Sequence, residues 1–218
     1  MPLCLHHTID GGGIAVWRIK ESAEELYALL ETSRFDSALA TISHEVRRAE
    51  WLAVRVLISQ LLGVDKEVAY QPSGRPYLAD GSYHISISHT KGYAAMAYHS
   101  CYPVGVDVEY IAHRVERIAH RFTHPSESTY IDVCDAGDRL MYWLINWSAK
   151  EALYKVFDNS AAAEFCEAFR IAPYKLAQQG EIDVQCFEKE DGGLPMCVCY
   201  RVFPDIVCTW VVFCDKVN

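Results

Sequence analysis

Two carboxylates lie close together in the segment VGVDVE, residues 104–109. Asp107 and Glu109 are two residues apart in an alternating apolar stretch, and such positions lie on the same face of a β-strand. Two like charges at that spacing repel each other unless a cation or a shared proton lies between them. Because no His or Cys stands beside them, these oxygen ligands favour Mg²⁺ over zinc. The alternative is a strand end whose two acids are simply solvated.

A second group of polar residues lies in WSAKEALYK, residues 147–155, where the sequence predicts a helix. Glu151 and Lys155 are four residues apart and therefore share one helix face. By themselves they could be only a surface ion pair worth about 0.2–0.5 kcal/mol. Taken together with Asp107 and Glu109, they supply a third acid and a cation for the same site.

VGVDVE followed by WSAKEALYK resembles the two signature motifs of the 4'-phosphopantetheinyl transferase superfamily. Further upstream, GRPYL (residues 74–78) and ISISHT (residues 85–90) resemble the family's G-K-P and S-H-S segments. The length of the chain resembles that of the monomeric, surfactin-synthetase-activating type. The resemblance covers residues 47–155.

The resemblance implies a chemistry that three carboxylates can support. In the family, the acids matching Asp107, Glu109 and Glu151 hold Mg²⁺, which also binds the pyrophosphate of coenzyme A and offsets charge building on its oxygens. The implied enzyme is a transferase of the holo-[acyl-carrier-protein] synthase type. It would move the 4'-phosphopantetheine moiety of coenzyme A to a serine of an apo acyl or peptidyl carrier protein and release adenosine 3',5'-bisphosphate.

Further residues take catalytic roles through the same resemblance. Glu127, in RFTHPSES, matches an acid expected to act as general base on the carrier serine, although it could instead only favour a helix dipole. Lys155 resembles a lysine near the leaving group, and with Glu151 it completes the expected catalytic set. Lys150 is expected to support the pyrophosphate or to reach solvent.

Another set of residues resembles the family's contacts to the phosphates of coenzyme A. Arg75 stands where Lys is common and still offers a bidentate phosphate contact. Ser88 and His89 match phosphate-contacting residues, although a single histidine could also be packed or solvated. One arginine of the long helix is a further candidate ligand: Arg48, or else Arg47 or Arg55.

Three arginines in HRVERIAHR suggest a surface for the carrier. Arg114, Arg117 and Arg121 are spaced to share one helix face, and carrier proteins of this class are acidic around the modified serine, so the face could dock one. The alternative is an ordinary solvated face, partly neutralised by Glu116.

Two other functions use the same residues. A magnesium-dependent nucleotide phosphohydrolase would use the same acids with water as the nucleophile. A non-catalytic homologue would bind coenzyme A only, but a pure binder gains nothing from a repulsive acid cluster.

The elements that must position these residues follow from periodicity and capping. Ser22 and Glu25 form a capping-box pattern before a short helix, and longer helices are predicted over residues 43–63 and 138–156, with a helical stretch at 115–122. In the last long helix, Tyr142, Trp143 and Trp147 are expected to pack in the core. Alternation and β-branched residues predict these strands: 14–19, 83–88, 93–99, 104–109, 182–187, 196–203 and 206–213.

The mixture of elements is α+β. The resemblance implies the 4'-phosphopantetheinyl transferase fold, in which two similar α/β halves, residues 1–103 and 104–218, pack as a pseudo-dimer. The first half would hold the nucleotide and its 3'-phosphate, and the second would carry the Mg²⁺ site and the catalytic motifs.

Composition narrows the class of protein. With 51% hydrophobic and 22% charged residues, the chain can bury a large core. A formal net charge of −9 argues against non-specific nucleic-acid binding. No long apolar run and no leader pattern is present, so a cytoplasmic protein that is not bound to a membrane is expected, with its nine cysteines as free thiols. The resemblance to the monomeric type implies a monomer.

Overall fold

The computed structural model describes residues 3–30, 34–157, 165–187 and 193–214. Two compact units make up the chain, residues 1–101 and 102–218. The division falls two residues before the boundary at 103/104 that the resemblance implied. Whether the two units are similar and pack as a pseudo-dimer stays a prediction.

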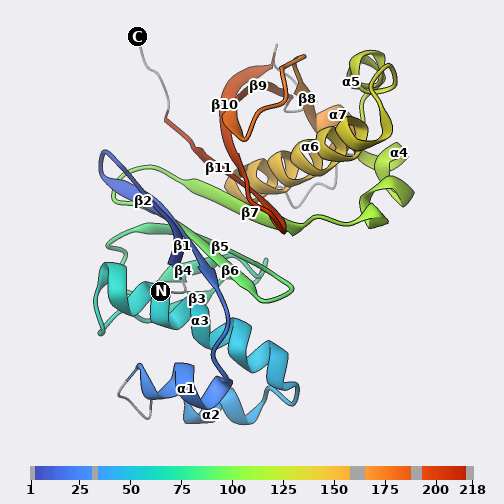
Figure 1. The fold of residues 1–218 in the computed structure, drawn as a ribbon. Helices are drawn as coiled ribbons and strands as arrows, with labels where there is room; N and C mark the ends of the chain where they lie inside the picture. The colour runs from blue at the N-terminus through green and yellow to red at the C-terminus, as the bar shows by residue number, and fades with distance from the viewer. Residues whose placement is uncertain (1–2, 31–33, 158–164, 188–192, 215–218) are drawn as a thin grey trace. The chain divides into compact units, whose positions relative to one another are not determined.

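The first unit contains a four-stranded antiparallel sheet in the order β1-β2-β6-β5 (Figure 1). Its strands are β1 (Leu3–Ile9), β2 (Gly12–Arg18), β5 (His84–Thr90) and β6 (Tyr93–His99). A two-stranded hairpin is formed by β3 (Val68–Tyr70) and β4 (Pro76–Leu78). The helices are α1 (Ala23–Ala28), α2 (Asp36–Ala40) and α3 (Glu45–Leu62).

The core of the first unit forms where α3 packs on this sheet. Buried Leu52 and Val56 of α3 share a cluster with Trp17 of β2 and Met96 of β6. The helix ends at Gly63, whose φ of 115° is accessible to glycine. The predicted capping box of α1 is confirmed: Ser22 Oγ accepts from Glu25 N–H, and Glu25 accepts from Ser22 N–H.

The second unit contains a five-stranded antiparallel sheet in the order β7-β11-β10-β9-β8. Its strands are β7 (Val104–Tyr110), β8 (Phe169–Ile171), β9 (Gln179–Cys186), β10 (Leu194–Val202) and β11 (Ile206–Val212). Its helices are η1 (His113–Arg117), α4 (Ala119–Phe122), α5 (Pro125–Ile131), α6 (Ala136–Phe157) and α7 (Phe165–Ala168).

Helix α6 packs mainly against β7 and β11. A Cβ atom added at Gly105 of β7 would lie only 1.9 Å from the Ala152 carbonyl oxygen, so the close approach of helix to strand requires glycine there. One turn earlier, Ser148 and Thr209 hydrogen bond through their side chains at 2.9 Å in a buried position. These two contacts fix the position of α6 over β7, which carries the acidic motif, and over the neighbouring strand β11.

Most predicted elements are present. The fold is α+β as expected, and the strands and both long helices lie near their predicted bounds. The predicted helical stretch at 115–122 is instead a 3₁₀ turn and a short helix, because Ile118 between them has φ −112° and ψ 0°. β1, β3, β4, β8, α2, α5 and α7 were not predicted.

None of the described helices is both long and apolar enough to span a membrane. All nine cysteines lie among the described residues, and each is a free thiol.

Candidate active site

The acidic cluster is built from β7 and α6. Asp107 of β7 is buried, with 5% of its surface exposed, whereas Glu109 and Glu151 are half-buried. The three carboxylates act on one another electrostatically: the charges of Asp107 and Glu109 both raise the pKa of Glu151. Strand and helix therefore bring together the three acids that the two motifs contribute.

This cluster holds more negative charge than its surroundings neutralise. Burial, and then the Asp107 charge, raise the pKa of Glu151 to about 7, against the opposing effect of Lys155. Burial and Asp107 likewise raise the pKa of Glu109, although the Trp147 indole, Arg114 and Lys155 oppose the shift. A site of this kind takes up a proton or a cation.

Helix α6 faces β7 with residues spaced four apart. Trp147 Nε1 donates to Glu109 Oε1 at 2.8 Å. Lys155 Nζ donates to Asp107 Oδ1 at 2.9 Å and to the Val106 carbonyl oxygen at 2.8 Å. Glu151 lies between these two contacts on the same helix face. Each acid of β7 is thus held by a donor of α6.

Trp147 was expected to belong only to the core. The structure adds a polar role, because its indole N–H orients Glu109. The sequence contained one signal for this: Trp147 precedes Glu151 by four residues, so the two side chains share one helix face.

The donor set of the cluster fits a magnesium ion in chemistry. It consists of carboxylate oxygens, which Mg²⁺ prefers, and Mg²⁺ is often held by one or two carboxylates together with substrate phosphates. Among the described residues, however, no three His, Cys, Asp or Glu side chains already form a group that could hold a metal ion. Asp107 and Glu109 instead hold the donors of Lys155 and Trp147.

Glu127 and Lys150 form a separate ion pair from which solvent is excluded. Both side chains have no exposed surface, and Lys150 Nζ lies 2.8 Å and 3.0 Å from the two Glu127 carboxylate oxygens. Lys150 also donates to the Phe122 carbonyl oxygen at 2.6 Å. Burial lowers the pKa of Lys150, and the Glu127 charge opposes that shift.

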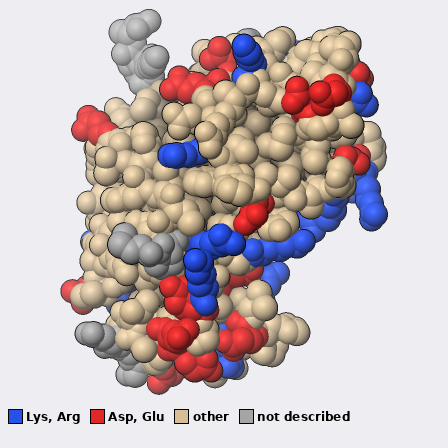
Figure 2. Space-filling model, viewed as in Figure 1, with Lys and Arg blue, Asp and Glu red and all other residues tan. Residues whose placement is uncertain are grey.

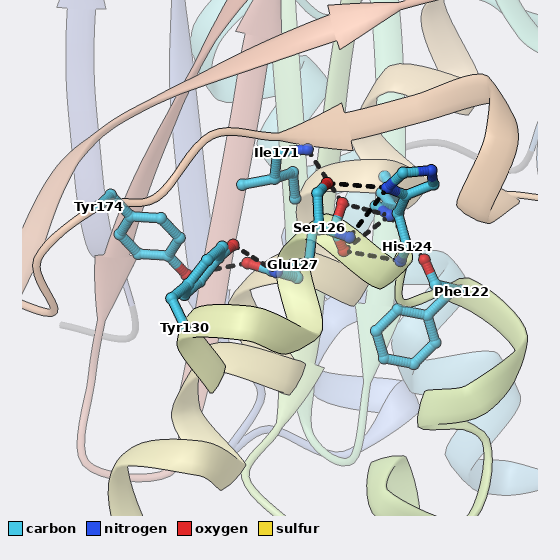
Figure 3. A network of polar contacts seen from close by, with 9 residues as sticks. Phe122, His124, Ser126, Glu127, Tyr130, Ile171 and Tyr174 are labelled. Carbon is cyan, nitrogen blue, oxygen red and sulfur yellow. Dashed lines mark hydrogen bonds and ion pairs between the residues drawn. The ribbon is translucent and has the colours of Figure 1, made fainter. Parts of the chain in front are cut away.

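Glu127 joins three segments of the second unit (Figure 3). Its carboxylate accepts the Ile171 N–H of β8 at 2.9 Å and the His124 N–H at 3.3 Å, which completes a capping box at the start of α5. Figure 3 also shows Tyr130 and Tyr174 to one side of Glu127. Both tyrosines hydrogen bond to Asn146 of α6, so the polar network continues along the helix.

Glu127 and Lys150 are both more enclosed than their expected roles suggested. Glu127 is enclosed and paired with Lys150, and its expected role as general base stays a prediction. Lys150 does not reach solvent, contrary to one of the two roles expected for it, and with no exposed surface it offers no contact to a pyrophosphate. The motif alone could not show this, because neighbouring residues of a helix point in different directions and only one of Lys150 and Glu151 can face β7.

The other expected coenzyme A ligands, apart from Lys150, lie in the first unit. His89 is 39% exposed at its side chain, and its Nδ1 lies 3.3 Å from Glu50 Oε2. Ser88 precedes it on β5 and is 9% exposed. Arg75 is half-buried just before β4, in the turn where the Gln71 N–H donates to its carbonyl oxygen.

The three arginines of α3 have different surroundings. Arg47 is exposed and lies 3.9 Å from Glu50. Half-buried Arg48 donates through Nε to the Ile42 carbonyl oxygen at 2.6 Å. Arg55 is 6% exposed, stacks on the Trp51 ring at 3.6 Å and donates to the Tyr70 hydroxyl at 3.1 Å.

The three arginines of the expected docking face are exposed on two different elements. Arg114 and Arg117 lie in η1, and Arg121 lies in α4. The prediction that they share the face of one continuous helix is wrong, because the chain turns at Ile118. In Figure 2, Lys and Arg side chains extend along the edge where Figure 1 draws α4.

Comparison with known proteins agrees with this arrangement of motifs. The model of the 4'-phosphopantetheinyl transferase superfamily matches residues 103–199, which include β7 and α6. The chain is 31% identical over 130 residues to the 4'-phosphopantetheinyl transferase AcpT of Salmonella typhimurium, covering 58% of this chain and 67% of that protein. It is 27% identical over 160 residues to the 4'-phosphopantetheinyl transferase Sfp of Bacillus subtilis, covering 67% of this chain and 69% of Sfp. With its acids on β7 and α6, the chain belongs to the 4'-phosphopantetheinyl transferase superfamily.

Proposed function

We propose that this protein transfers the 4'-phosphopantetheine moiety of coenzyme A to a serine of an apo acyl or peptidyl carrier protein. The observation that carries the proposal is the cluster of Asp107, Glu109 and Glu151 beside Lys155. The serine oxygen forms a bond to the β-phosphorus as the bond between that phosphorus and the bridging pyrophosphate oxygen breaks. Adenosine 3',5'-bisphosphate leaves, and the serine proton passes to a base.

Asp107, Glu109 and Glu151 are the residues that would hold Mg²⁺. When bound, the ion neutralises charge that develops on the pyrophosphate oxygens. The raised pKa values of Glu109 and Glu151 support this assignment, because they report acids crowded together in a partly buried place.

Glu151 is the accessible acid of the expected catalytic set. Its carboxyl is half-buried and therefore accessible, unlike that of Glu127. A Mg²⁺ ion held by this carboxylate would keep it ionised, so the pKa of about 7 describes Glu151 before an ion is bound. The Glu127–Lys150 pair instead supports the helix that carries Glu151.

Lys155 supplies the positive charge of this group. Its Nζ holds Asp107 at 2.9 Å, and its side chain remains 27% exposed. A partly exposed ammonium at this position can also approach a phosphate oxygen of the departing adenosine 3',5'-bisphosphate. Lys155 therefore orients an acid and offsets charge on the leaving group.

The phosphates of coenzyme A would be bound by Arg75, Ser88 and His89, with Arg48 as a further ligand. Arg55 is a weaker candidate, because it is almost fully buried and held by Trp51 and Tyr70. The exposed Arg114, Arg117 and Arg121 would meet the acidic surface of the carrier.

The test is the intact mass of an apo acyl carrier protein after incubation with this protein, coenzyme A and Mg²⁺. The parent protein should add one phosphopantetheine, Glu151→Ala should add none, and the control Glu181→Ala, which removes an exposed acid of β9, should behave as the parent. Failure to modify several unrelated apo carriers would overturn the proposal. Carrier-free release of phosphopantetheine would then indicate a hydrolase, and coenzyme A binding without products would indicate a non-catalytic homologue.

A further inference from the structure

Glu50 is a buried carboxylate that lies outside the signature motifs. It is 7% exposed on α3, next to the buried residues Ala49 and Leu52 of the same helix. An ionised carboxylate in such a place is costly unless it is paired. The partners of Glu50 therefore indicate why an acid is present there.

The partner of Glu50 comes from β5. His89 Nδ1 lies 3.3 Å from Glu50 Oε2, and Arg47 Nη1 approaches the same oxygen only to 3.9 Å. The two side chains differ in exposure, at 9% for Glu50 and 39% for His89. The pair thus has a buried end on the helix and an accessible end on the strand.

This ion-pair contact favours one orientation of the His89 ring, with Nδ1 toward Glu50. Because Nδ1 faces Glu50, Nε2 lies on the far side of the ring, away from the carboxylate. An imidazolium has an N–H at both nitrogens. A protonated ring whose Nδ1 faces the Glu50 carboxylate can therefore turn its Nε2–H toward a phosphate oxygen.

We propose that Glu50 is a positioning residue, which orients His89 for contact with a phosphate group of coenzyme A without touching the substrate itself. The inference rests on the proposed function, since it needs His89 to be a coenzyme A ligand. The arrangement parallels a carboxylate that fixes a histidine ring in a catalytic or metal site, where the group behind the ring decides which nitrogen faces the ligand.

The experiment measures coenzyme A binding by calorimetry and steady-state kinetics for four proteins: the parent, Glu50→Gln, His89→Ala and the double variant. Loss of a charge-assisted hydrogen bond should raise the Kd for coenzyme A about tenfold in His89→Ala. Glu50→Gln should raise the Kd and KM for coenzyme A about threefold to tenfold and leave kcat nearly unchanged.

The double variant separates positioning from a general effect on folding. If Glu50 acts through His89, Glu50→Gln should cause no further loss in the His89→Ala background. The inference would be overturned if Glu50→Gln raised the Kd for coenzyme A equally with and without His89, or if it left the Kd of the parent protein unchanged. The control Glu67→Gln removes an exposed carboxylate of the same unit and should bind coenzyme A as the parent does.

A measurement on the unaltered protein covers the case in which Glu50→Gln does not fold. Nitrogen-15 spectra of the histidine rings, with His89 signals identified by their loss in His89→Ala, report which ring nitrogens carry protons. In the coenzyme A complex both nitrogens of His89 should be protonated, and an unprotonated Nδ1 would refute the role of Glu50. The ligand role of His89 and the positioning role of Glu50 fail separately. If His89→Ala binds coenzyme A as tightly as the parent, His89 is not a ligand. If His89→Ala binds coenzyme A more weakly but Glu50→Gln binds it as the parent does, only the positioning role is refuted.

Discussion

At the scale of single residues, the second unit contains acids in two contrasting environments. Glu127 is enclosed, paired with Lys150 and surrounded by backbone donors, so its charge is satisfied within the protein. Glu151 is adjacent to Lys150 in sequence but is half-buried near two other acids, so its charge is not satisfied. The first arrangement suits a structural group, and the second suits one that binds or transfers a proton or a cation.

The buried pair leads to a prediction about stability. Lys150→Met should lower the free energy of unfolding by about 3–5 kcal/mol, because it leaves the Glu127 charge buried without its cation. Lys150→Met combined with Glu127→Gln should recover most of that loss, since a neutral amide still accepts the Ile171 N–H. Urea unfolding measures both; a double variant no more stable than Lys150→Met would contradict the prediction. Glu167→Gln, which breaks an exposed ion pair, is the control and should cost less than about 1 kcal/mol.

Glu151 leads to a prediction about pH in protein freed of divalent metal with a chelator. Its pKa rises from 4.5 in the unfolded chain to about 7 in the folded protein. A raised carboxyl pKa stabilises the fold fully below 4.5, and that contribution is lost as the pH rises through about 7. Between these values the free energy of unfolding should fall more steeply with pH in the parent than in Glu151→Gln. Identical slopes in urea unfolding would show that the Glu151 carboxyl does not titrate in this way.

At the scale of elements, the site depends on how closely α6 approaches β7. Lys155 reaches Asp107, and Trp147 reaches Glu109, only because Gly105 lets the Ala152 turn of the helix lie against the strand. The buried Ser148–Thr209 hydrogen bond holds the same helix against the neighbouring strand β11. A glycine inside the acidic motif thus serves packing, and packing places the acids.

Gly105→Ala should therefore damage both stability and activity. Its Cβ would lie 1.9 Å from the Ala152 carbonyl oxygen, so the helix must move away from β7. We expect a loss of about 1–3 kcal/mol in the free energy of unfolding and weaker transfer activity. Gly137→Ala near the start of the same helix is the control: its Cβ meets Asp135 Oδ1 at 3.5 Å, and it should stabilise the protein by about 0.5–1 kcal/mol. Unchanged activity in a folded Gly105→Ala would show that the site does not need this spacing.

At the scale of the whole molecule, charge is unevenly distributed. The chain has a net charge of −9, and Figure 2 shows acidic side chains gathered at the end of the first unit where α1 and α2 lie. In contrast, η1 and α4 expose Arg114, Arg117 and Arg121. A protein that is acidic overall can therefore still present a basic surface to an acidic partner.

Charge reversal tests that surface. Arg117→Glu combined with Arg121→Glu should raise the KM for the carrier protein and leave the KM for coenzyme A unchanged, because only the carrier would meet these two side chains. Arg114 is left in place, since its charge acts on Glu109. The effect should shrink at high ionic strength, since salt screens exposed charges. Equal changes in both Michaelis constants would show that these arginines do not act on carrier binding alone.

Local patterns in the sequence determined which residues share a strand or helix face, where a helix begins and which family the protein belongs to. The two-residue period of a strand placed Asp107 and Glu109 on one face of β7, and the helical period placed Glu151 and Lys155 on one face of α6. The capping box at Ser22 depended only on neighbouring residues. The family also followed from motifs that are short and contiguous. These features depend on backbone geometry, which a few adjacent residues set.

Tertiary structure decided what each side chain meets. It enclosed Glu127 with Lys150, gave Trp147 a polar role and turned the chain at Ile118, so that the three arginines do not share one helix. It also paired Glu50 of α3 with His89 of β5, two residues that no local pattern relates. The physical reason is that burial and electrostatic partners depend on segments distant in sequence, and these segments meet only when helices and sheets pack.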